Sequence, residues 1–181
     1  MARFLHGTTL TWREDDGTGA ARDGELTNPD LSGVEAVPSK YWKVAGGSVV
    51  EMTTEEKAVV DAAELTAAKV AKMAAIDANT ATLVSAGVSV ATGKTISTSL
   101  AATQNLQNLW IGFQQGIVTL PKSISTTDGG TYTITDNADL IRIAALLRDF
   151  QLTIIEAGQS LRADVLAATT LAGVAAVEDS R

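Results

Sequence analysis

A glycine–lysine–threonine sequence is the first group of residues in this chain whose types could carry chemistry. Gly93, Lys94 and Thr95 match the end of a phosphate-binding loop, in which backbone amides and the lysine hold phosphate groups. That motif needs another glycine five positions before the second one, where this chain has Val88. We therefore interpret the tripeptide as a hairpin turn and predict no nucleotide site.

Metal-binding side chains are equally sparse in the sequence. His6 is the only histidine and the chain has no cysteine, so neither a histidine pair nor a thiolate site can form within one copy. A three-fold axis could gather three copies of His6 around one ion, but an ordinary strand residue is the simpler interpretation. Glu14, Asp15 and Asp16 lack the spaced ligands of a calcium loop. We predict no metal site and no cofactor.

The remaining candidates for catalysis also have structural explanations. Glu55 and Glu56 would sit in the first turn of a helix, where negative charge interacts favourably with the helix dipole. Scattered aromatic residues such as Trp12 and Trp110 are more often core or interface anchors than a sugar-binding platform. We expect no catalytic residue and no cofactor-binding residue, and an enzyme is the least favoured class.

Composition narrows the possible partners. The net charge of −7 leaves no basic stripe to neutralise phosphates, so we expect no nucleic acid among the partners. No hydrophobic run has the length of a secretory signal or a membrane span, so we expect no membrane partner either. Hydrophobic residues make up 45% of the chain but aromatic residues only 4%, and alanine buries little area. Such a chain needs other copies or a partner to bury enough surface.

One long helix, from about residue 140 to 168, organises the rest of the chain. Its apolar positions alternate in steps of three and four, which predicts a seam that packs lengthwise against other helices. The seam residues are Leu140, Ile143, Leu147, Phe150, Ile154, Ala157 and Leu161. Arg148 and other charged residues lie off this seam, and Asp136 is one of three candidate N-caps before the helix.

Shorter sequence patterns predict the other helices and the hairpins. Thr53 and Glu56 form a capping-box pattern that predicts a helix from about 54 to 84, which Gly87 should end. A weaker seam runs along that helix, and another helix is predicted at about 99–117. Glycine-containing turns between short β-prone runs predict three hairpins, at 41–52, 88–97 and 122–135.

The N-terminal segment, residues 1–38, differs from the rest of the chain in its residue pattern and composition. Residues 4–12 alternate as one strand would, with Phe4, Leu10 and Trp12 on the same face. The polar, glycine-containing stretch that follows has too few large apolar side chains to fold alone. We expect an extended arm that docks by adding a strand to a partner sheet, with Trp12 as an anchor. The alternative is pairing with the 41–52 strands of its own chain.

These elements predict a mainly α fold with small β-hairpins, in the α+β class. The long helices should pack as a helical bundle or a coiled-coil-like assembly. Three segments are expected: the docking arm at 1–38, a hairpin with a long helix at 39–86, and a helical domain with two small hairpins at 87–181.

Two stretches resemble modules of small tail-associated structural proteins of tailed bacteriophages. The first is VPSKYWKVAGGSVVEMTTEEKAVVDAA, in which a short strand pair leads into a long helix. The second joins the hairpin sequence DGGTYTITD to a long helix and the run LRADVLAATTLAGVAAV. Together they cover roughly residues 37–178. The resemblance brings no catalytic residue with it.

The resemblance implies a structural protein of a virion, made in the host cytoplasm: a short tail-fibre, whisker or adaptor component. It would self-associate, with three copies as the expected number because fibres favour three-fold symmetry, and bind other virion proteins of the tail, baseplate, neck or capsid. A fibre-assembly chaperone that leaves the mature particle and a capsid decoration protein are the alternatives. The chain is far shorter than a long receptor-binding fibre and lacks the glycine-rich repeats of a shaft, so the resemblance does not imply receptor binding.

Overall fold

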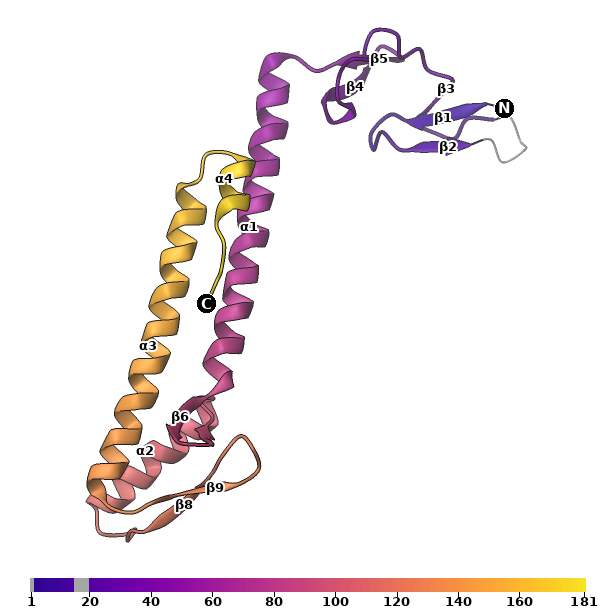
Figure 1. The fold of residues 1–181 in the computed structure, drawn as a ribbon. Helices are drawn as coiled ribbons and strands as arrows, with labels where there is room; N and C mark the ends of the chain where they lie inside the picture. The colour runs from indigo at the N-terminus through magenta and orange to yellow at the C-terminus, as the bar shows by residue number, and fades with distance from the viewer. Residues whose placement is uncertain (1, 15–19) are drawn as a thin grey trace. The chain divides into compact units, whose positions relative to one another are not determined.

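The structure is a computed structural model that describes residues 2–14 and 20–181. The chain divides into two compact units, Met1–Ala67 and Ala68–Arg181. The boundary falls inside the long helix α1 (Thr54–Ala86), drawn in magenta in Figure 1. This division differs from the three segments expected from the sequence. The first part of the chain packs with the hairpin that follows it, and the second half of α1 packs with later helices.

The first unit contains two small antiparallel sheets. One has the strand order β2-β1-β3, and the other is the hairpin β4-β5. Their strands are β1 (Arg3–His6), β2 (Trp12–Glu14), β3 (Glu25–Thr27), β4 (Trp42–Ala45) and β5 (Ser48–Glu51), with a short 3-10 helix, η1 (Ser39–Tyr41), before β4. Leu5, Val34 and Val49 form the centre of the core, so both sheets and the loop between them contribute to it.

The described residues of this segment, 2–14 and 20–38, are therefore not the extended arm that composition suggested. The predicted continuous strand at 4–12 is also wrong: β1 ends at His6, and the chain reverses so that Leu5 pairs with Trp12. Local alternation could not reveal this turn, because the loss of chain entropy is offset by core contacts with residues far along the sequence. The alternative, pairing with the 41–52 strands, is not what the structure shows either: β1 pairs with β2 and β3, and the described part of the segment meets the β4-β5 hairpin through the shared core around Leu5 and Val49.

The start and end of α1 follow from local chemistry. The backbone amide of Thr53 donates to Glu56 Oε2 at 2.8 Å, and the amide of Glu56 donates to Thr53 Oγ1 at 3.3 Å, which confirms the predicted capping box. Gly87 then follows the helix with φ of +95°. A Cβ on Gly87 would lie 2.5 Å from the carbonyl oxygen of Ile96, so the turn into the next strand requires glycine.

The second unit combines two hairpins with three helices and the second half of α1. Its elements are β6 (Val88–Ala91), β7 (Lys94–Ile96), α2 (Leu100–Gln114), β8 (Lys122–Ser125), β9 (Thr131–Ile134), α3 (Asn137–Ala167) and α4 (Leu171–Ala176). Asp136 caps α3 by accepting from the amide of Asp139 at 2.9 Å, as predicted. All of the hairpins and long helices expected from the sequence are present within a few residues of their predicted bounds.

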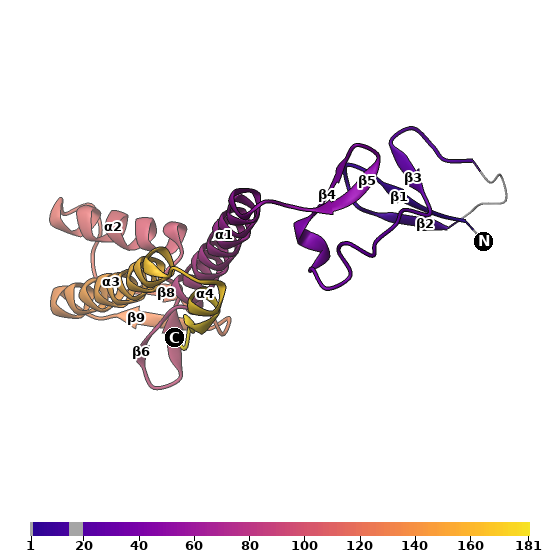
Figure 2. The same ribbon diagram turned by 90° about the horizontal axis from the view of Figure 1, so that it is seen from above.

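The core of the second unit lies where both hairpins meet α2 and the first turns of α3. Its buried residues are Val90, Ile96, Leu106, Ile134, Leu140, Ile143 and Leu147. Farther along, α3 runs antiparallel to the second half of α1, since Lys69 contacts Leu166 and Asp77 contacts Arg162. Figure 1 shows these two helices side by side with α4 folded against them, and Figure 2 shows α2 beside α3. The α+β class is thus confirmed.

Candidate functional site

The predicted seam of α3 faces the interior of the second unit. Leu140, Ile143 and Leu147 are buried, and the other four members, Phe150, Ile154, Ala157 and Leu161, are half-buried. The first three belong to the core with the hairpins, whereas Gly158 and Val165 continue the buried face toward α1 and α4. The seven residues therefore mark the face that α3 uses within its own chain.

The contact between α1 and α3 is close at Gly158. A Cβ there would lie 2.7 Å from Thr80 Oγ1 and 2.8 Å from Nη1 of Arg181. The Nζ of Lys69 donates to the carbonyl oxygen of Leu166 at 2.7 Å, and Arg162 forms an ion pair with Asp77. Ile76 is buried on α1, and a close approach at glycine together with polar contacts nearer the helix ends completes the pair, which fits the weakness of the α1 seam in the sequence.

Two clusters of titratable side chains connect elements of the second unit. Asp179 accepts from Arg181 Nη2 at 2.6 Å and from Asn79 Nδ2 at 2.9 Å, and these hydrogen bonds hold the pKa of Asp179 well below its usual range. Burial raises the pKa of Asp139, but hydrogen bonds from Arg142 and Tyr132 outweigh it and leave the pKa lowered. Since their charged groups are satisfied by one another, we interpret both clusters as structural.

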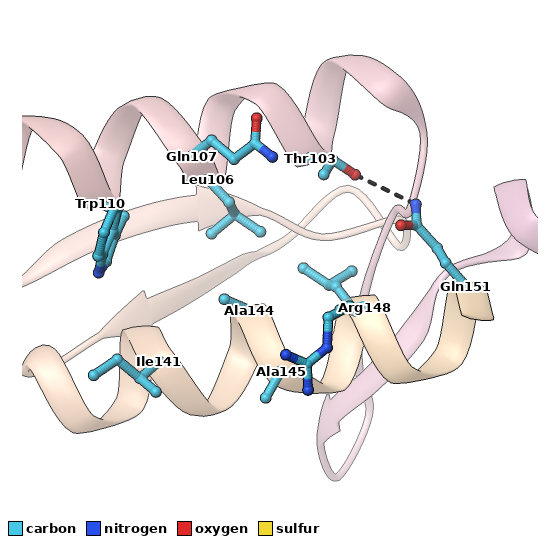
Figure 3. A pocket seen from close by; sticks show the side chains of 10 residues that line it. Thr103, Leu106, Gln107, Trp110, Ile141, Ala144, Ala145, Arg148 and Gln151 are labelled. Atoms are coloured by element: carbon cyan, nitrogen blue, oxygen red, sulfur yellow. Dashed lines mark hydrogen bonds between the residues drawn. The ribbon is translucent and has the colours of Figure 1, made fainter. Parts of the chain in front are cut away.

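A groove of about 490 Å³ lies between α2 and α3. It is lined by Thr103, Leu106, Gln107, Trp110, Ile141, Ala144, Ala145, Leu147, Arg148 and Gln151. Figure 3 shows Leu106 and Trp110 pointing from α2 toward α3, with Ala144 pointing back. Because alanines occupy part of the α3 wall, side chains do not fill the space between the two helices. The groove is mainly apolar, and Arg148 is its one charged residue.

Part of the α3 wall of this groove belongs to a second, mainly apolar stripe on the helix, which the sequence interpretation missed. The stripe consists of Ile141, Ala145, Arg148, Leu152 and Ile155, again in steps of four and three. At 100° per residue it lies about 150° around the helix from the seam. Ile141, Leu152 and Ile155 are 52%, 47% and 39% exposed. Counting apolar positions in a second register could have found it, but Arg148 in its middle made that face look solvated.

The three residues predicted to dock the N-terminal segment do not share a face. Phe4 is fully buried, with the Arg13 guanidinium 4.3 Å from its ring centre, so it is not available to a partner. Leu10 lies in the turn after β1, with φ of +50°, and packs against the core around Leu5. Trp12 alone is well exposed, at 46%, on the outer strand β2.

The residues considered for a phosphate site or a metal site have ordinary structural roles. Gly93 and Lys94 lie at the turn between β6 and β7, and Lys94 Nζ is 3.9 Å from Asp128. His6 Nδ1 accepts from the amides of Thr8 and Thr9, both at 3.3 Å.

Within residues 2–14 and 20–181, no three acidic, histidine or cysteine side chains are grouped so as to hold a metal ion. Asp15 and Asp16 of the acidic run considered for calcium lie outside the described residues. Among the described helices, none combines the length and hydropathy needed to cross a membrane.

Comparison of the chain with protein-family models, curated proteins and solved structures found no match.

Proposed function

We propose that this protein is a self-associating structural component of a tailed-bacteriophage particle, of the short tail-fibre, whisker or adaptor type. The observation that carries the self-association is the exposed apolar stripe on α3, centred on Arg148 and flanked by Ile141 and Ile155. Several large apolar side chains exposed on one helix face are unfavourable in water, and such clusters often mark an interaction site. The phage context comes from the sequence resemblance over residues 37–178. No catalytic step and no cofactor is part of the proposal.

The number of copies and the point of attachment are also proposals. Three copies are what the resemblance to fibres favours. Attachment to the particle would use β2, the outermost described strand of its sheet, where Trp12 offers a large, half-exposed ring. Edge strands accept additional strands through main-chain hydrogen bonds, and an aromatic residue there adds an anchor. This version of docking needs only Trp12, because Phe4 and Leu10 serve the core of their own unit.

Mass spectrometry of purified phage particles tests the virion assignment directly, with the protein expected at stoichiometric abundance. A Trp12→Ala variant tests the docking surface. We expect it to fold and self-associate as before, since Trp12 is about half exposed and lies outside the core around Leu5, but to be depleted from particles. Retention of the variant at the normal level would rule out docking through this residue.

A fibre-assembly chaperone is the second candidate, and the groove between α2 and α3 favours it. An open apolar groove between two helices is a common receptor for an amphipathic helix of a client protein. A chaperone would bind the unassembled fibre in infected-cell extracts and be absent from mature particles. The particle analysis above therefore separates the two functions.

A further inference from the structure

Charged side chains connect the first turns of α1 to the segment that precedes it in the first unit. The Nζ of Lys40, in the 3-10 helix η1, donates to Asp61 Oδ1 at 2.9 Å and to Glu64 Oε2 at 2.8 Å. The hydroxyl of Tyr41 donates to the same oxygen of Asp61 at 2.6 Å. These contacts join η1 to the second and third turns of α1.

Two further ion pairs lie beside the junction of β5 and α1. Lys43 Nζ on β4 donates to Glu56 Oε1 at 2.7 Å, and Lys57 on α1 pairs with Glu51 on β5. The two-residue link Met52–Thr53 separates the strand from the helix. Each pair therefore connects the hairpin with the first turn of α1 across this short link.

The apolar core of the first unit does not extend onto α1. Its centre is formed by Leu5, Val34 and Val49, and none of the described residues in that core or packed against it belongs to the helix. Val59 on α1 is 69% exposed. The angle between the hairpin and the helix therefore depends chiefly on the polar contacts.

We propose that the link Met52–Thr53 is a hinge between the β4-β5 hairpin and α1, and that Lys40, bound to Asp61 and Glu64, is the latch that holds the hinge at one angle. Hinges of this kind are a few residues at the end of an element that absorb a change of backbone dihedral angles. Such a hinge lets α1 change direction relative to whatever the first unit binds. The inference does not rest on the proposed function.

Lys40 is better placed than the other cations to act as the latch. Asp61 and Glu64 follow Thr53 by eight and eleven residues, which is about 12 and 17 Å along a helix that rises 1.5 Å per residue. The glutamate that pairs with Lys43 lies only three residues from Thr53. Because a contact far from a pivot resists rotation more strongly than one beside it, the loss of Lys40 should free the hinge most.

The latch is exposed enough to respond to salt. The side chains of Lys40, Asp61 and Glu64 are 36%, 52% and 39% exposed. Exposed ion pairs are individually weak, and dissolved ions screen them. The apolar core around Leu5 has no charge to screen. A rise in ionic strength should therefore release the hinge while the two sheets stay folded.

Distances between two spin labels, measured by double electron–electron resonance, test the hinge in the full chain. Ser48→Cys and Ala67→Cys place the labels at exposed positions of the hairpin and the helix, and the chain has no other cysteine. Dilution with unlabelled chain restricts the signal to distances within one chain. We expect one narrow distribution at about 0.01 M salt and a roughly twofold wider one at about 1 M, because the Debye length falls from about 30 Å to about 3 Å.

Lys40→Met removes the charge and keeps an unbranched side chain. We expect this variant to give the wide distribution already at low salt. Lys40→Glu should widen or shift the distribution further, because it places a third carboxylate beside Asp61 and Glu64. Lys122→Met is the matched control, since Lys122 is an exposed lysine on β8 of the second unit, and it should leave the low-salt distribution narrow.

A second pair of labels shows whether α1 itself stays intact. Ala58→Cys and Ala74→Cys are exposed positions on this helix. Their distance distribution should be the same at both salt concentrations and in every variant. Widening of this second distribution would assign the effect to fraying of the helix and overturn the hinge.

The remaining outcomes separate the hinge from its latch. A distribution between positions 48 and 67 that stays narrow at high salt and in Lys40→Met would mean that other contacts fix the angle, and the hinge would be wrong. A wide distribution of the natural chain at low salt, or widening by salt but not by Lys40→Met, would remove Lys40 as the latch. None of these results bears on the presence of the protein in particles, which mass spectrometry decides separately.

Discussion

The Nη1 of Arg181 donates a hydrogen bond to the backbone carbonyl oxygen of Ile154 across 2.9 Å. Through Nη2 the same guanidinium reaches the carbonyl of Ile76 on α1 at 3.4 Å, so one side chain spans both long helices of the second unit. It is largely buried, and Asp179 neutralises it. The segment after α4 is thereby fastened between α1 and α3.

Removal of this guanidinium should destabilise the second unit. We expect Arg181→Ala to lower its free energy of unfolding by about 1–3 kcal/mol, because two backbone carbonyls and Asp179 lose a donor in a partly buried site. Arg181→Lys should recover only part of this, since an ammonium group cannot span both helices as a planar fork does. Urea unfolding followed by circular dichroism measures both, with exposed Glu178→Ala as the control. Equal stability of all three variants would mean that the clamp contributes nothing.

Gly158 permits the close approach of α3 to α1, and a larger residue should force the helices apart. Gly158→Leu is expected to cost about 1–3 kcal/mol, because its side chain would occupy the positions of Thr80 Oγ1 and the Arg181 guanidinium. Ala163→Leu, at an exposed position of the same helix, should change stability by less than about 0.5 kcal/mol. Thermal melting of the two variants side by side checks this; similar melting temperatures would show that Gly158 is not a packing constraint.

The register of α3 can be tested with one charge at two adjacent positions. Leu147→Asp would place an unpaired carboxylate in the core, and we expect loss of folding or a destabilisation of several kcal/mol. Arg148→Asp, on the exposed side, should melt almost as the natural chain does in dilute solution, where association makes no contribution. Near-equal melting of the two variants would contradict the assigned register.

The stability of the first unit should depend on pH through Glu25. Hydrogen bonds from the Arg13 side chain and the Arg22 backbone lower the pKa of Glu25 from 4.5 to about 2. A carboxylate whose pKa is lowered by folding stabilises the folded state above the unfolded pKa. That contribution is lost as the pH falls through the folded value. We therefore expect a loss of stability between pH 4.5 and 2.

Tryptophan fluorescence in a Trp110→Phe background reports on this unit, because the two remaining tryptophans, Trp12 and Trp42, both lie in it. Glu25→Gln should be less stable at neutral pH and show a flatter pH dependence in the same window. An unchanged slope in this variant would assign the acid sensitivity to other carboxylates.

The sequence alone determined the elements whose causes are local. Thr53 with Glu56, Asp136 and Gly87 set helix ends through hydrogen bonds or backbone conformations within a few residues, and each acts as predicted. The seam of α3 was also identifiable, because a buried helical face repeats every three to four residues and needs no knowledge of its partner.

Only the tertiary structure decided where distant segments meet. The alternation at residues 4–12 suited one strand, but the chain turns after His6 because Leu5 and Leu10 both reach a core shared with Val49. The α2–α3 groove likewise depends on two helices separated by a hairpin, and on alanines that leave the space between them unfilled. A one-dimensional pattern records which residues avoid water, whereas packing decides which of two apolar faces the chain itself covers.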